Sequence, residues 1–121
     1  MKNGKIEGKH MMWYKNGKKQ SEAFYKNGVQ SGKLLMWNGN GKKMHKLYFK
    51  NGKKEGKYTS WHKNGNKKSV GFFKNGKPSG KWVVWYENGN GQKKHEFTYK
   101  NNKREGEATK WYQTGEKYIL E

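Results

Sequence analysis

A repeat of about 24 residues runs through the chain of 121 residues and constrains its fold more than any other feature. Five glycines recur at intervals of 24, 24, 24 and 26 residues: Gly8, Gly32, Gly56, Gly80 and Gly106. A tryptophan lies five residues beyond each of them: Trp13, Trp37, Trp61, Trp85 and Trp111. Such a period indicates an architecture in which each unit packs on its neighbours. We divide the chain into five units, approximately residues 2–25, 26–49, 50–73, 74–99 and 100–121, within one domain over residues 1–121.

Each unit holds two turn signals, one before the repeated glycine and one after the tryptophan. Asn-Gly pairs occur before the glycine at 27–28, 51–52 and 75–76, and after the tryptophan at 16–17, 40–41 and 64–65. Asn-Gly between β-prone runs predicts a hairpin, because both residues tolerate the positive φ of a type I′ turn. The runs between the turns are short and rich in aromatic and β-branched residues, which favours strands of about five or six residues.

The predicted fold is therefore all-β, a single-layer antiparallel meander of about ten short strands built from five two-strand repeats. Alternation along a strand places Trp61 with Thr59 and Lys57 on one face, and Tyr58 on the other. We expect one face to bury aromatic side chains against each other and the other to be half covered by lysine stems. Ala23 and Gly71 are the small residues at which curling would bring side chains together.

Charge is the second strong feature, since 28 Lys and Arg residues against 9 acidic residues give a net charge of +19. The chain has no cysteine and its acidic residues are all glutamate, which removes thiolate chemistry and Asp-based triads. His45 and His95 fall about 19 Å apart by the strand spacing, too far to share a metal ion. We expect no catalytic residue, no metal and no cofactor.

The basic and aromatic columns are the remaining candidates for a binding site. One lysine column lies on the predicted tryptophan side and another along one margin of turns; they are Lys9, Lys33, Lys57 and Lys81, and Lys26, Lys50, Lys74 and Lys100. These lysines either bind an anionic partner or keep an exposed sheet soluble and guard its edges. The five tryptophans form either an aromatic platform for a ligand or, as we favour, a packing ladder.

The phrases YKNGVQSGKLLMW, FKNGKKEGKYTSW and FKNGKPSGKWVVWYENG resemble MORN-type repeats, and more closely the bacterial variant known as the YwqK-type antitoxin family. The resemblance covers the chain from Lys2 to about Gly115. It implies a β-hairpin repeat sheet that has no enzymatic activity and serves as a scaffold, a dimer surface or a lipid-contacting module. The family's usual second glycine is replaced here, by His10, Leu34, Tyr58, Trp82 and Ala108.

From the charge and the resemblance we predict a non-enzymatic module that presents a lysine-rich surface to an acidic partner protein, in an antitoxin-like or immunity-like role. The alternatives are sequence-independent binding of nucleic acid or an anionic membrane surface, and a structural scaffold that assembles end to end as a homo-oligomer. The charge also fits the lysine and asparagine codons of an adenine/thymine-rich genome. If Met1 is the native start, we expect a cytoplasmic protein, because no apolar stretch of signal-peptide length follows it.

Overall fold

The computed structural model describes residues 4–88, 90–101 and 103–118. All regular secondary structure in them is β, so none of the described segments is a helix that could span a bilayer. Eleven strands form one sheet: β1 (Gly8–Trp13), β2 (Lys19–Lys26), β3 (Val29–Gln30), β4 (Gly32–Trp37), β5 (Lys43–Lys50), β6 (Lys53–Lys54), β7 (Gly56–Trp61), β8 (Lys67–Lys74), β9 (Lys77–Trp85), β10 (Lys93–Lys100) and β11 (Lys103–Lys110).

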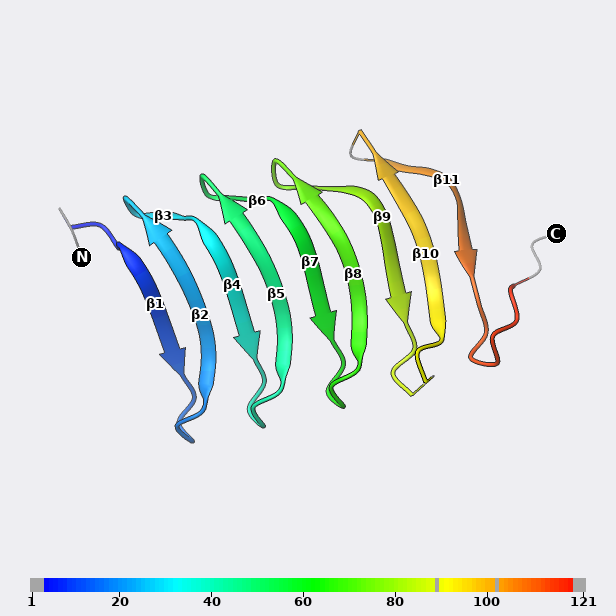
Figure 1. Ribbon diagram of the computed structural model, residues 1–121, viewed down its shortest axis with the longest axis horizontal. Helices are drawn as coiled ribbons and strands as arrows, with labels where there is room; N and C mark the ends of the chain where they lie inside the picture. Colours follow the sequence, from blue (N-terminus) through cyan, green and yellow to red (C-terminus); the bar gives the residue numbers. More distant parts are fainter. Residues whose placement is uncertain (1–3, 89, 102, 119–121) are drawn as a thin grey trace.

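The strands follow the chain across the sheet in the order β1-β2-β4-β5-β7-β8-β9-β10-β11, and each pair is antiparallel. The two short strands β3 and β6 pair beside β2 and β5. Figure 1 shows the described strands side by side in one curved layer, with turns along two opposite margins. The predicted single-layer antiparallel meander is confirmed.

Strand number and length differ from the prediction at identifiable places. β2, β5, β8 and β10 have eight residues each, more than the five or six expected. The strand after the turn is broken at Ser31 and Glu55, each followed by a glycine with positive φ, 98° at Gly32 and 95° at Gly56. This conformation shifts the pairing and separates the short strands β3 and β6. After Trp111, the described residues show one isolated bridge, to Lys117, where a tenth long strand was expected.

The two margins use different turns. At one margin Asn27, Asn51 and Asn75 have φ of 52°, 51° and 51° and precede glycines that also have positive φ, the signature of type I′. At the other margin Gly17, Gly41 and Gly65 have positive φ, but the asparagines before them do not. The Gly17 N–H donates to Tyr14 O at 3.0 Å and Tyr14 N–H donates to Lys18 O at 2.8 Å. This loop is one residue longer, a type I turn followed by a left-handed glycine, so the prediction of type I′ is wrong there.

The cross-strand register defines two faces of the sheet. The tryptophan face carries an unbroken row of paired residues that crosses all the long strands: Met11, Glu22, Leu35, Lys46, Thr59, Val70, Val83, Glu96 and Thr109. Alternation places the repeated tryptophans on the same side. The opposite side, which we call the ring face, carries Tyr58, Phe73, Trp82, Phe97 and Tyr99, whose rings contact one another.

The interior is small because a single layer has only its own side chains to cover it. Ala23 and Leu47 are buried on the ring face, and Leu35 and Thr59 on the tryptophan face. Most of the rings are half-buried instead. Stability therefore rests on contacts between neighbouring units and not on a central core.

Gly71 is the point at which two units come closest on the ring face. It pairs with Tyr58 across the strands, and the indole of Trp82 lies over it, so that a Cβ built on Gly71 would fall 2.0 Å from Cδ2 of Trp82. The rings of Tyr58 and Trp82 are 5.6 Å apart between centroids, and Phe73 meets Trp82 edge-on at 5.3 Å. The missing side chain at position 71 thus admits the largest aromatic cluster of the sheet, as expected for this residue.

Hydrogen bonds tie successive units together at both margins. At the type I′ margin the turn glycine donates its N–H to a carbonyl of the preceding unit, as in Gly52 to Gln30 at 2.9 Å and Gly76 to Lys54 at 2.8 Å. At the opposite margin the side chain after the tryptophan reaches the tryptophan carbonyl of the next unit: Tyr14 Oη to Trp37 O at 2.7 Å, His62 Nε2 to Trp85 O at 3.0 Å and Tyr86 Oη to Trp111 O at 2.6 Å.

Substitution of Gly71→Ala is expected to lower the free energy of unfolding by about 1–3 kcal/mol, because the added methyl group overpacks against the Trp82 ring. Gly in a strand interior normally weakens it, so the effect runs against strand propensity. Urea denaturation of Gly71→Ala, Trp82→Leu and the double variant measures it. The alanine should cost less when Trp82 is leucine; an equal cost in both backgrounds would show that the indole is not responsible.

Candidate anion-binding surface

The lysine column predicted on the tryptophan side lies on that face and alternates with aromatic rings. Cross-strand pairing sets Lys9 opposite Phe24, Lys33 opposite Tyr48, Lys57 opposite Phe72 and Lys81 opposite Thr98. Lys9, Lys57 and Lys81 are exposed and Lys33 is half-buried. The rings are also accessible, with Phe72 47 % and Tyr48 37 % exposed. The face therefore offers charge and apolar area together.

The five tryptophans lie at equivalent positions but do not stack on one another. In the part of the chain that the structure describes, none of the ring–ring contacts involves them. Instead, an ammonium group from the preceding unit lies 5.8 Å from the ring centroid in three cases: Lys19 over Trp37, Lys43 over Trp61 and Lys93 over Trp111. Trp13, in the first unit, is 56 % exposed. The packing partner of the tryptophan row is a lysine stem, which forms a cation–π contact.

The second lysine column lies along the type I′ margin, where the structure doubles it. Lys50 pairs with Lys53, Lys74 with Lys77 and Lys100 with Lys103, whereas Lys26 pairs with Val29. Like charges directly opposite each other destabilise a sheet. The margin therefore gathers cations at some cost to stability.

Sequence reasoning missed the lysines that complete both groups. Lys53, Lys77 and Lys103 follow the Asn-Gly turn by one residue, and a two-residue type I′ loop places them opposite the lysines already named. Lys19, Lys43 and Lys93 needed the register of the other, longer loop. Both sets repeat with the period of the units, and that period was the signal that could have found them.

Carboxylates compensate this positive face only toward its ends. In the row that crosses the sheet, Glu22 lies in the first unit and Glu96 in the fourth, while Lys46 and Val70 hold the equivalent positions between them. Glu22 lies 3.6 Å from Lys9 Nζ and 3.8 Å from Lys19 Nζ. The middle of the row, around Lys46, has no such partner among the residues that the structure describes in this row.

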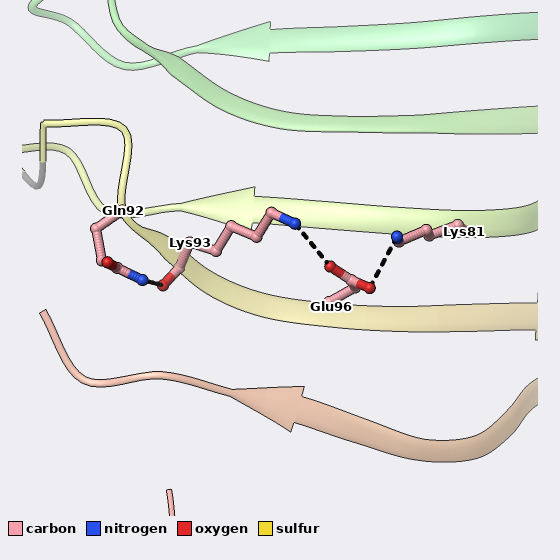
Figure 2. Close-up of polar contacts among 4 residues, drawn as sticks. All are labelled: Lys81, Gln92, Lys93 and Glu96. Atoms are coloured by element: carbon pink, nitrogen blue, oxygen red, sulfur yellow. Dashed lines mark hydrogen bonds and ion pairs between the residues drawn. The ribbon is translucent and has the colours of Figure 1, made fainter. Parts of the chain in front are cut away.

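Glu96 forms the best-defined ion pair of the face, shown in Figure 2. Its Oε1 lies 2.9 Å from Lys81 Nζ on the neighbouring strand, and its Oε2 lies 3.1 Å from Lys93 Nζ on the same strand. The hydrogen bond from Lys81, followed by that from Lys93, lowers the pKa of Glu96 below its ordinary value, although burial acts in the opposite direction.

Two histidines lie on the ring face, away from the lysine columns. Burial, followed by the nearby charges of Lys68 and Lys54, lowers the pKa of His45, which hydrogen-bonds through Nδ1 to Tyr58 Oη at 2.8 Å. Burial, followed by the charge of Lys110 and other cations, lowers the pKa of His95. Both imidazoles are neutral at pH 7. Within the described ranges, no three histidine or acidic side chains gather as a metal site.

Substitution of Glu96→Gln is expected to lower the free energy of unfolding at pH 7 by up to about 1 kcal/mol. Because the pKa of Glu96 is lower in the folded chain, its contribution is present above the ordinary pKa of glutamate and is lost as the pH falls below it. Thermal unfolding of wild type and variant from pH 7 to pH 3 should therefore converge at the acid end. Glu116→Gln, in an exposed turn, is the control; a gap that persists at pH 3 would contradict the ion-pair origin.

The sequence pattern of the family described as MORN repeat variant matches residues 6–27, 54–75 and 78–101, which together make up more than half of the chain. No curated protein matches the sequence. The antitoxin-labelled branch expected from the resemblance stays a prediction. The hairpin units seen in the sheet correspond to the matched segments, and the chain belongs to the family of MORN repeat variants.

Proposed function

We propose that this repeat sheet is a non-catalytic binding module whose tryptophan face docks on an acidic surface of another protein. The observation that carries the proposal is the middle of that face. There Lys33, Lys46 and Lys57 lie beside the exposed rings of Tyr48 and Phe72, in the units where the crossing row has no glutamate.

The mixture of groups favours a protein partner. Protein interfaces are enriched in aromatic residues at their centre, and complementary charge guides the approach of the two surfaces. An ammonium group over an aromatic ring, as in Lys46 over Tyr48 at 6.0 Å, keeps both side chains available at the surface. A toxin with an acidic surface would be such a partner, and the module would then act as an antitoxin or immunity protein.

Nucleic acid and anionic membrane are the competing partners of a basic face. The chain has a single arginine, Arg104, which lies over Phe97 on the ring face. Bidentate recognition of guanine is best served by arginine, so any nucleic-acid binding would be electrostatic and steeply dependent on salt. A face that alternates lysines with exposed rings also differs from a purely electrostatic membrane contact.

The test compares two charge reversals of equal size. Lys33→Glu/Lys57→Glu changes the middle of the tryptophan face, whereas Lys15→Glu/Lys63→Glu changes exposed turn residues at the margin opposite the type I′ turns. Each protein is used to capture partners from nuclease-treated lysate, and the affinity of each captured acidic protein is then measured directly. The first pair should weaken binding at least about tenfold, the second little.

Defined probes separate the competing partners. A single-stranded oligonucleotide, and phosphatidylcholine vesicles that contain phosphatidylserine, are titrated at about 0.05 M and 0.15 M salt. An acidic protein that binds at both salt concentrations and loses affinity only with Lys33→Glu/Lys57→Glu supports the proposal. Equal losses in both variants, or tighter binding of oligonucleotide or vesicles than of any acidic protein, would refute it.

A further inference from the structure

We propose that a groove at the type I′ margin is a separate binding site for a small soluble anion that carries several phosphate groups. The groove has a volume of about 630 Å³ and lies beside the turns that join units three to five. Its lining supplies four lysines, with two asparagines, a serine and a proline: Lys53, Lys74, Lys77, Lys100, Asn75, Asn101, Ser79 and Pro78. This site lies beyond the docking function proposed above, which uses the middle of the tryptophan face.

The repeat itself delivers these lysines to one place. The stem of Lys53 lies over the turn of the next unit, since a Cβ built on Gly76 would be 3.8 Å from Cβ of Lys53. The Gly76 N–H is held by Lys54 O, so the turn is fixed against the preceding unit. Lys74 and Lys77 face each other across that turn, and Lys100 comes from the next one. Side chains from three successive units therefore share one space.

The chemistry of the lining matches phosphate better than carboxylate. The described lining has no acidic side chain, and it offers four ammonium groups, two amides and one hydroxyl as hydrogen-bond donors. A carboxylate has two oxygens to accept them, whereas each phosphate group has three or more. Lysine binds phosphate as a point charge, and charge-assisted hydrogen bonds of this kind are the stronger ones. The volume is also within the range of about 300–1,000 Å³ that is typical of small-molecule sites.

An equivalent groove at the first turns shows what the site requires. That groove has about 310 Å³ and is lined by one lysine, Lys26, together with Asn27, Val29, Ser31 and Asn51. Val29 holds the position that lysine holds in the later units. The backbone repeat is thus the same, but the concentration of positive charge is confined to units three to five. A third groove beside Lys103 and Arg104 includes Glu105, which pairs weakly with Lys100 at 3.9 Å.

Phosphate groups could reach this groove from a soluble ligand or from a lipid headgroup. Pro78 is the one lining residue without a polar side chain, so the groove offers almost no apolar area to insert among acyl chains. The four lysines also come from turns at the margin and converge on a space instead of spreading over a plane. Both features favour a soluble oligophosphate.

The experiment titrates the full chain with sodium triphosphate by calorimetry at about 0.15 M salt, where long-range attraction is screened. We expect saturable binding of one triphosphate per chain, tighter than that of inorganic phosphate. Lys77→Val copies the residue at position 29 and is compatible with the fold, and it should weaken triphosphate binding about tenfold. Lys63→Val removes the same charge at the opposite margin and should change the affinity by less than about twofold.

The outcomes are distinct from those of the docking test. Equal weakening by Lys77→Val and Lys63→Val, or the absence of saturation, would show that triphosphate responds only to net charge and would overturn the proposal. Vesicles that contain phosphatidic acid form the other arm; if they bind through Lys77 and triphosphate does not displace them, the ligand is a lipid headgroup and the proposal of a soluble ligand is wrong. Lys33→Glu/Lys57→Glu should leave triphosphate binding within about threefold, so the site can fail or stand independently of the docking face.

Discussion

The rest of the structure depends on the hydrogen bonds that each unit makes with the next. A single layer has no second sheet or helix to bury its turns, and an unpaired backbone group away from water is costly. The type I′ glycines solve this by donating to the preceding unit, and the tyrosine or histidine after each tryptophan does so by donating to the following one. The interval of about 24 residues is therefore fixed by the need of every turn to meet its neighbour at the same height.

With the margins tied, the two faces can differ in their roles. The ring face gathers aromatic side chains into edge-on and tilted contacts around Gly71, and it holds the two histidines with lowered pKa values. Aromatic rings supply much buried area per residue, which a chain with 30 % hydrophobic residues needs. The tryptophan face packs each indole against a lysine stem, so it keeps its ammonium groups at the surface. Stability is concentrated on one side and charge on the other.

The charge is not evenly balanced within its own face. Glu22 and Glu96 neutralise lysines in the first and fourth units, but the row is uncompensated between them, and the type I′ margin sets lysine opposite lysine. Such pairs repel each other and lower stability, although solvent screens them. An anionic partner would relieve this repulsion. The same physical argument supports both proposals, a protein surface over the middle of the face and an oligophosphate in the groove.

The sequence by itself determined the period, the all-β meander and the side of the sheet on which the tryptophans and Lys57 lie, because turn residues and alternation act locally. It also marked Gly71 as a point of close approach. Only the tertiary structure decided that the loops after the tryptophans are type I turns, that the indoles pack on Lys19, Lys43 and Lys93, and that the lysines of three units converge on one groove. These features depend on how one unit is placed against the next. That placement is set by side chains more than 20 residues apart, which a local pattern does not encode.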